Sequence, residues 1–124
     1  MNRPELLEAL LSVEKQTYTN IEIILVDATG KGLDRHKSLA LNTALYEVGD
    51  QRPLNRPAAA NLALASAHSS FMLFLDEDDW IAPNHIEMLV ECLQANHTIG
   101  VAYSSTQKTT PAGIPSGAAF RIDY

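Results

Sequence analysis

Apolar residues follow two spacings along the chain, one typical of helices and one typical of buried strands. Leucines recur at helical spacing over residues 6–11, so residues 3–16 are predicted to form a helix with one buried face. A continuous apolar run at 71–75 is typical of a strand that is buried on both faces, and the apolar, β-branched run at 21–26 is a second signal of this kind. The chain therefore begins with a helix and a strand, and a second strong strand pattern follows past its middle.

Weaker patterns between and after these runs continue the alternation. We expect helices over residues 34–44, 57–67 and 85–93, short strands at 46–48, 101–104 and 119–124, and loops at 28–32, 50–56 and 109–117. Alternating helices and strands predict an α/β fold with a mostly parallel sheet and flanking helices. We expect one domain over residues 1–124, a length that suffices for a single core.

Four acids stand directly after the second apolar run, at residues 76–79. In an open α/β sheet, ligands bind where the strands end. Four adjacent carboxylates repel one another unless a cation joins them, and Mg²⁺ or the similar Mn²⁺ takes oxygen ligands and bridges to phosphates. This pattern predicts a metal-assisted phosphate or diphosphate site. A solvated acidic turn that opens the next helix is the alternative that the acids alone leave open.

Composition narrows the range of partners. Hydrophobic residues make up 46% of the chain and charged residues 19%, which is typical of a soluble globular protein. The net charge of −6 argues against a nucleic-acid partner, which would require clustered Lys and Arg. No apolar run reaches transmembrane length and residues 1–5 do not resemble a signal peptide, so we expect a cytoplasmic protein. The single cysteine, Cys92, is expected to be a small buried residue of its helix.

The order of these signals resembles family 2 glycosyltransferases of the GT-A fold, a Rossmann-like nucleotide-diphospho-sugar transferase fold. The resemblance covers residues 2–105. It rests on Ser12-Val13, Gln16-Thr17-Tyr18, the strand Asn20–Asp27, Ala60-Asn61-Leu62-Ala63, Phe74–Trp80 and Pro83, in that order.

This resemblance implies a nucleotide-diphosphate sugar as donor, an acceptor that the sequence does not identify, and an inverting sugar transfer. Asp76, Glu77 and Asp78 occupy the place of the family's Asp-x-Asp motif. The resemblance implies that Asp78, with Asp76, holds Mg²⁺ or Mn²⁺, while Asp76 or Glu77 lies nearer the ribose. It also places Asp27 near the nucleotide base and makes Arg56 the cation best placed to approach the base or the phosphates; a solvated loop arginine is the alternative for Arg56.

The chain also departs from the family pattern. Ala28 stands where an acid usually reads the base, and Ala60 stands where an arginine is common. The family's first strand would precede Asn2 and its acceptor half, with the catalytic base, would follow residue 124, so no residue is assigned as base. The resemblance places that first strand between the apolar runs 21–26 and 71–75. Neither run can stay an open sheet edge without inviting pairing with another chain. The two strands could close up on each other, the tail at 119–124 could fold in, or a second copy could supply a strand. Closing up would disturb the helix packing and the tail carries Arg121 and Asp123, so we expect a homodimer.

Three hypotheses for function follow. The first is the donor-binding part of a glycosyltransferase. The second is a non-catalytic nucleotide-binding or assembly module that retains the fold. The third is a haloacid-dehalogenase-like phosphatase, whose first motif is also a strand followed by Asp-x-Asp, although Trp80 stands where that class has Thr or Val.

Overall fold

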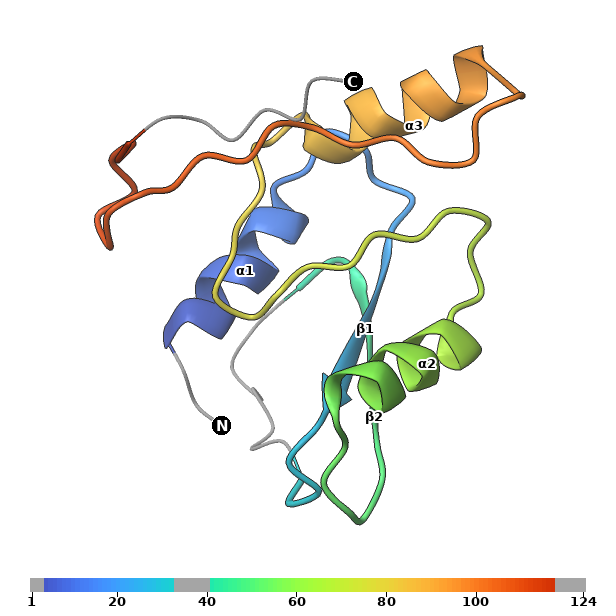
Figure 1. The fold of residues 1–124 in the computed structure, drawn as a ribbon, viewed down its shortest axis with the longest axis vertical. Coiled ribbons are helices and arrows are strands. Elements are labelled where there is room, and N and C mark those ends of the chain that lie inside the picture. The colour runs from blue at the N-terminus through green and yellow to red at the C-terminus, as the bar shows by residue number, and fades with distance from the viewer. Residues whose placement is uncertain (1–3, 33–40, 118–124) are drawn as a thin grey trace. The chain divides into compact units, whose positions relative to one another are not determined.

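The computed structural model describes residues 4–32 and 41–117. These residues form two strands and three helices, shown in Figure 1: α1 Pro4–Glu14, β1 Glu22–Asp27, β2 Ala44–Gly49, α2 Arg56–Ser66 and α3 His85–Ala95. The chain divides into two compact units, Met1–Ile86 and Glu87–Tyr124. The prediction of a single domain stays a prediction.

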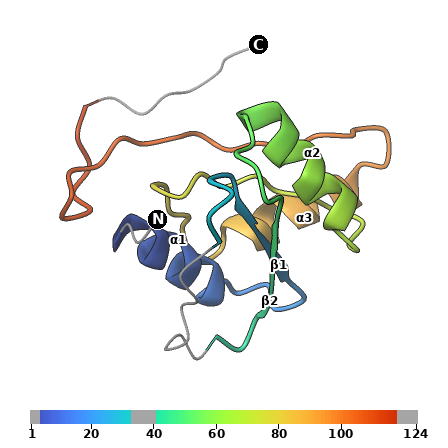
Figure 2. The ribbon, with the colours of Figure 1, turned by 90° about the horizontal axis from the view of Figure 1, so that it is seen from below.

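The first unit is built around a two-stranded parallel sheet. β1 and β2 pair in register from Glu22 opposite Ala44 to Asp27 opposite Gly49. Helix α2 packs against both strands, and α1 and α2 lie on opposite sides of the sheet (Figures 1 and 2). The predicted α/β class with a parallel sheet and flanking helices is therefore confirmed. Because the strands are parallel, Asp27 and Gly49 share the carboxyl edge of the sheet.

Helix α1 supplies most of the buried apolar side chains of this unit. Leu6, Ala9 and Leu10 are each 4% exposed and recur at the spacing of one helix face. Leu7, which lies off that face, is 40% exposed. Pro4 is the first helical residue, where its missing N–H costs nothing. The predicted helix is confirmed, with its end at Glu14.

Helix α2 begins behind an asparagine cap. The Asn55 Oδ1 accepts a hydrogen bond from the backbone N–H of Ala58 at 2.9 Å, and Pro57 occupies the first turn. The helices predicted at 57–67 and 85–93 are confirmed as α2 and α3. In α3, Val90 is buried, whereas Cys92 is exposed, so the expectation of a buried cysteine is wrong.

The apolar run at 71–75 is the main difference from the sequence prediction. It forms no strand, and its side chains are exposed: 44% for Phe71, 40% for Met72, 44% for Leu73 and 63% for Phe74. An apolar run is buried on both faces only when neighbouring elements cover it. Within the described residues no strand pairs with this run. The predicted buried strand is therefore wrong for this structure.

Other predicted elements have mixed outcomes. The short strand at 46–48 is confirmed as part of β2. No strand is present at 101–104, and the loop at 109–117 is confirmed as a turn that includes an isolated bridge between Thr109 and Pro115. Most of the predicted helix at 34–44 and most of the strand at 119–124 lie outside the described residues.

Candidate functional site

Asp27, the last residue of β1, organises the loop that follows the strand. It is 5% exposed, and both oxygens of its carboxylate are used within its own loop. The Oδ1 accepts from the backbone N–H of Thr29 at 2.8 Å and from the Thr29 hydroxyl at 2.6 Å, while the Oδ2 accepts from the N–H of Gly32 at 2.7 Å. The Thr29 hydroxyl, followed by its backbone N–H, lowers the pKa of Asp27 below the ordinary 3.8 because these donors favour the charged form. The predicted contact of Asp27 with a nucleotide base stays a prediction.

The loops after β1 and β2 contact each other closely at this edge of the sheet. The backbone N–H of Leu54 donates to the carbonyl of Ala28 at 2.9 Å. Gly30 has a φ of +71°, and a methyl group added there would lie 2.6 Å from the backbone carbonyl carbon of Arg52. Only glycine fits such a close approach at a positive φ. Residues 27–32 and 50–54 are therefore held against one another through their backbones.

Positively charged side chains lie on these loops or directly after them, although the whole chain has a net charge of −6. Arg56 is the first residue of α2 and is exposed. The side chain of Arg52 is 86% exposed and lies 3.9 Å from the carboxylate of Asp50, a surface pair that contributes little stability. Lys31 is also exposed on the first loop. Cations on both loops give the carboxyl edge of the sheet groups that can approach a phosphate.

The four acids form a turn. The backbone N–H of Asp79 donates to the carbonyl of Asp76 at 3.1 Å. Asp76, Asp78 and Asp79 are exposed and Glu77 is half-buried, while Trp80 directly after them is 47% exposed. Within the described part of the chain, no three His, Cys, Asp or Glu side chains converge as a group that could hold a metal ion. The turn presents carboxylates to solvent without enclosing a cation by itself.

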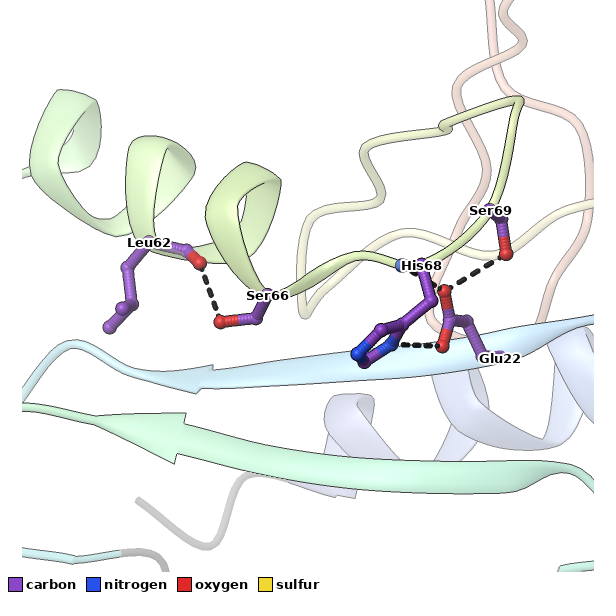
Figure 3. A network of polar contacts seen from close by, with 5 residues as sticks. All are labelled: Glu22, Leu62, Ser66, His68 and Ser69. Atoms are coloured by element: carbon purple, nitrogen blue, oxygen red, sulfur yellow. Dashed lines mark hydrogen bonds and ion pairs between the residues drawn. The ribbon is translucent and has the colours of Figure 1, made fainter.

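A polar network anchors the segment that leads into the apolar run. Figure 3 shows the carboxylate of Glu22, at the start of β1, facing His68 and Ser69. Glu22 accepts from the backbone N–H of His68 at 2.7 Å and from the Ser69 hydroxyl at 2.9 Å, and its other oxygen lies 3.1 Å from the Nδ1 of His68. The backbone N–H of His68 is the largest cause of a lowered pKa for Glu22. Sequence reasoning missed this network.

A second polar network, also missed, anchors the segment after the acidic turn. Gln16, which is 7% exposed, donates from its Nε2 to the carbonyl of Ala82 at 2.7 Å. Its Oε1 accepts from the backbone N–H of Ile86 at 3.0 Å. The Ser12 hydroxyl accepts from the N–H of Ile81 at 3.2 Å. A polar side chain at the end of an otherwise apolar helix face was the available signal, but its partners could not be read from the sequence.

The parallel sheet, the acidic turn and the order of the motifs define a family. The chain belongs to glycosyl transferase family 2, which its sequence matches over residues 1–118. This result leaves the phosphatase-like hypothesis without support. No solved structure was found to match the chain.

Relatives with similar sequences carry glycosyltransferase names. An uncharacterized glycosyltransferase of Haemophilus influenzae is 32% identical over 101 residues, covering 74% of this chain and 38% of that protein. GlyA of Streptococcus pneumoniae, named a glycosyltransferase, is 33% identical over 105 residues, covering 78% of this chain and 15% of GlyA. WfgD of Escherichia coli, named a UDP-Glc:alpha-D-GlcNAc-diphosphoundecaprenol beta-1,3-glucosyltransferase, is 33% identical over 91 residues, covering 72% of this chain and 36% of WfgD. The chain thus matches less than half the length of each relative.

Among the described residues, no helix has the length and apolar character needed to cross a bilayer.

Proposed function

We propose that this chain is the donor-binding part of a family 2 glycosyltransferase, which binds a nucleotide-diphosphate sugar together with Mg²⁺ or Mn²⁺ at the acidic turn of residues 76–79. The observation that carries the proposal is this turn, which exposes the carboxylates of Asp76 and Asp78 in a chain of that family. Its oxygen donors suit a hard divalent cation.

The donor set of the turn fits a cation that is shared with phosphates. Mg²⁺ is usually held by one or two carboxylates plus substrate phosphates, not by a complete cage of protein ligands. The absence of a converging group of three ligand side chains in the described residues agrees with such a shared site. We assign Asp78 and Asp76 as the metal ligands, with Asp76 or Glu77 nearer the ribose.

Arg56 and Asp27 are the other residues that we assign to the binding of the donor. The net charge of −6 would repel a free diphosphate. Arg56, at the first turn of α2, is proposed to approach the base or the phosphates, and Asp27 is proposed to lie near the base. A bound divalent cation supplies Lewis-acid stabilisation of the departing diphosphate. The inverting transfer also needs a general base on the acceptor hydroxyl, and no described residue is assigned that role.

Calorimetry with UDP and with GDP tests the metal site. We expect the 124-residue chain to bind a nucleoside diphosphate with Mn²⁺ present and to lose this binding in chelator. Asp78→Ala should weaken binding by more than about tenfold, because even residues that only orient metal ligands contribute 10–100-fold to metal affinity. Glu91→Ala, which removes an exposed acid from α3, is the matched control and should bind like the original chain. Equal binding with and without chelator, or full binding by Asp78→Ala, would contradict the proposal.

A non-catalytic nucleotide-binding module is the second candidate function. It is favoured by Asp27, whose two oxygens are already engaged in its own loop and so are less available to a ligand. This candidate shares the binding result and differs in turnover: UDP-sugar would be bound but neither hydrolysed nor transferred. Release of UDP from a donor sugar, measured with Mn²⁺ in the original chain and in Asp78→Ala, separates the two candidates.

We also propose that the chain forms a homodimer. The support is the exposed apolar run of residues 71–75, which has no sheet partner among the described residues. Exposed, unpaired apolar segments of this kind favour pairing with another chain.

A further inference from the structure

The acidic turn lies in a segment that is anchored on both sides. Between members of residues 71–80, all of which the structure describes, the one backbone hydrogen bond is that from Asp79 to Asp76. Before this segment, Glu22 binds His68 and Ser69. After it, the end of α1 binds residues 81–86. The anchors on either side therefore contribute to the direction in which the turn presents its carboxylates.

The anchor after the turn lies nearer to the acids along the chain than the anchor before it. It comprises four hydrogen bonds that join Ser12, Gln16 and Thr17 to residues 81–86. Besides the bonds of Gln16 and Ser12 described above, the backbone N–H of Thr17 donates to the carbonyl of Pro83 at 2.8 Å. The anchor reaches Ile81, which is three residues after Asp78 and directly after Trp80.

Gln16 is chemically suited to this position. Its amide has both donors and an acceptor, so it satisfies the carbonyls of Ser12 and Ala82 and the N–H of Ile86 at the same time. Gln16 and Asp27 are the two buried polar side chains of the described residues. A buried amide of this kind persists only when it is fully hydrogen-bonded.

We infer that Gln16, assisted by Ser12, is a positioning residue for the acidic turn: it fixes residues 81–86 and thereby the orientation of Asp76 and Asp78. This inference rests on the proposed function for its consequence in binding. The structural part, that Gln16 restrains the turn, does not depend on any ligand.

Trp80 provides a direct probe because it is the single tryptophan of the chain and lies between the turn and the anchor. Gln16→Met keeps the length of the side chain but removes its donors and acceptor. We expect this variant to fold, to show a lower fluorescence anisotropy of Trp80 without ligand, and to bind Mn²⁺ with UDP about tenfold more weakly, at the lower end of the range for residues that orient metal ligands. Ser12→Ala removes one bond of the anchor, that to Ile81, together with the bond from the Ser12 hydroxyl to the carbonyl of Ala9 inside α1, and should show a smaller change in both measurements.

Gln94→Met is the matched control, since Gln94 is an exposed glutamine of α3, away from the residues assigned to the donor site. It should leave both the anisotropy and the affinity unchanged. A folded Gln16→Met with unchanged anisotropy and affinity would overturn the inference. If Gln16→Met fails to fold, Ser12→Ala decides by the same two measurements, and unchanged values there overturn it. If the original chain binds no Mn²⁺ with UDP, the proposed function fails, and the Trp80 anisotropy alone still decides the positioning role.

Discussion

At the residue scale, the loop after β1 shows how one carboxylate and one glycine define an edge of the sheet. Asp27 accepts hydrogen bonds from Thr29 and Gly32, and Gly30 allows the backbone of the loop to approach residues 52–53. The sequence could predict that an acid ends this strand. It could not predict that the Asp27 carboxylate binds donors of the loop that follows it, because the path of this loop depends on the positive φ of Gly30 and Gly32.

The two glycines of this loop allow a matched test of the close approach. Gly30→Ala meets both a positive φ and the backbone of Arg52, whereas Gly32→Ala meets only a positive φ, with no atom within 4 Å of the added methyl group. A non-glycine residue at a positive φ costs about 1–3 kcal/mol. We expect Gly32→Ala to lower the free energy of unfolding by about 1 kcal/mol and Gly30→Ala by about 2–4 kcal/mol. Urea unfolding followed by Trp80 fluorescence measures both, and equal losses would show that the loops can separate without cost.

At the element scale, the predictions that succeeded depended on local signals. The spacing of leucines predicted α1, and Pro57 marked the first turn of α2. The acidic turn was found because its residues are contiguous. Gln16 and Glu22 were missed because their partners lie 46 to 70 residues away along the chain. The apolar run 71–75 was mispredicted because an apolar pattern shows a tendency to be buried but does not show which element covers it.

The exposed run predicts a measurable association. If residues 71–75 pair with a second copy, light scattering across a dilution series should show a dimer that dissociates on dilution. Phe74 is the most exposed of residues 71–74, at 63%. Phe74→Ser should shift the protein toward monomer because it removes apolar area from the contact. Val101→Ser, which is 78% exposed outside the run, is the control. A cooperatively folded monomer at all concentrations would show that the exposed run needs no partner.

At the scale of the whole molecule, three carboxylates hold parts of the chain in place. Glu14 and Glu22 bind residues that are distant in sequence, and Asp27 binds donors of its own loop. Glu14 on α1 accepts from the N–H of Asn42 and from the N–H and hydroxyl of Thr43, just before β2. The Thr43 hydroxyl is the largest cause of its lowered pKa. Glu22 and Asp27, described above, have lowered pKa values for the same kind of reason, because donors favour the charged form. All three act only while they are ionised.

These shifts fix the direction in which stability depends on pH. A carboxyl whose pKa is lower in the folded chain stabilises it above the unfolded pKa, and this contribution is lost as the pH falls through the folded value. For the two glutamates the loss begins below about pH 4.5 and for Asp27 below about pH 3.8. Burial lowers the pKa of His85 from 6.5, so a further loss begins below about pH 6.5. Stability should therefore fall in a first step that begins below about pH 6.5 and more steeply below about pH 4.5.

Urea unfolding at a series of pH values from 7 to 3.5 measures this profile. His85→Gln should remove the first step and leave the loss of stability below pH 4.5, because the lowered pKa values of Glu14, Glu22 and Asp27 remain. Glu14→Gln should lower stability at pH 7, where its ionised carboxylate binds three donors, and should make the loss below pH 4.5 shallower, since one fewer shifted carboxyl is protonated. Glu8→Gln, an exposed change on the same helix, should keep the original profile. A midpoint that stays constant down to pH 3.5 would mean that the contacts of Glu14, Glu22 and Asp27 do not hold these segments together in solution.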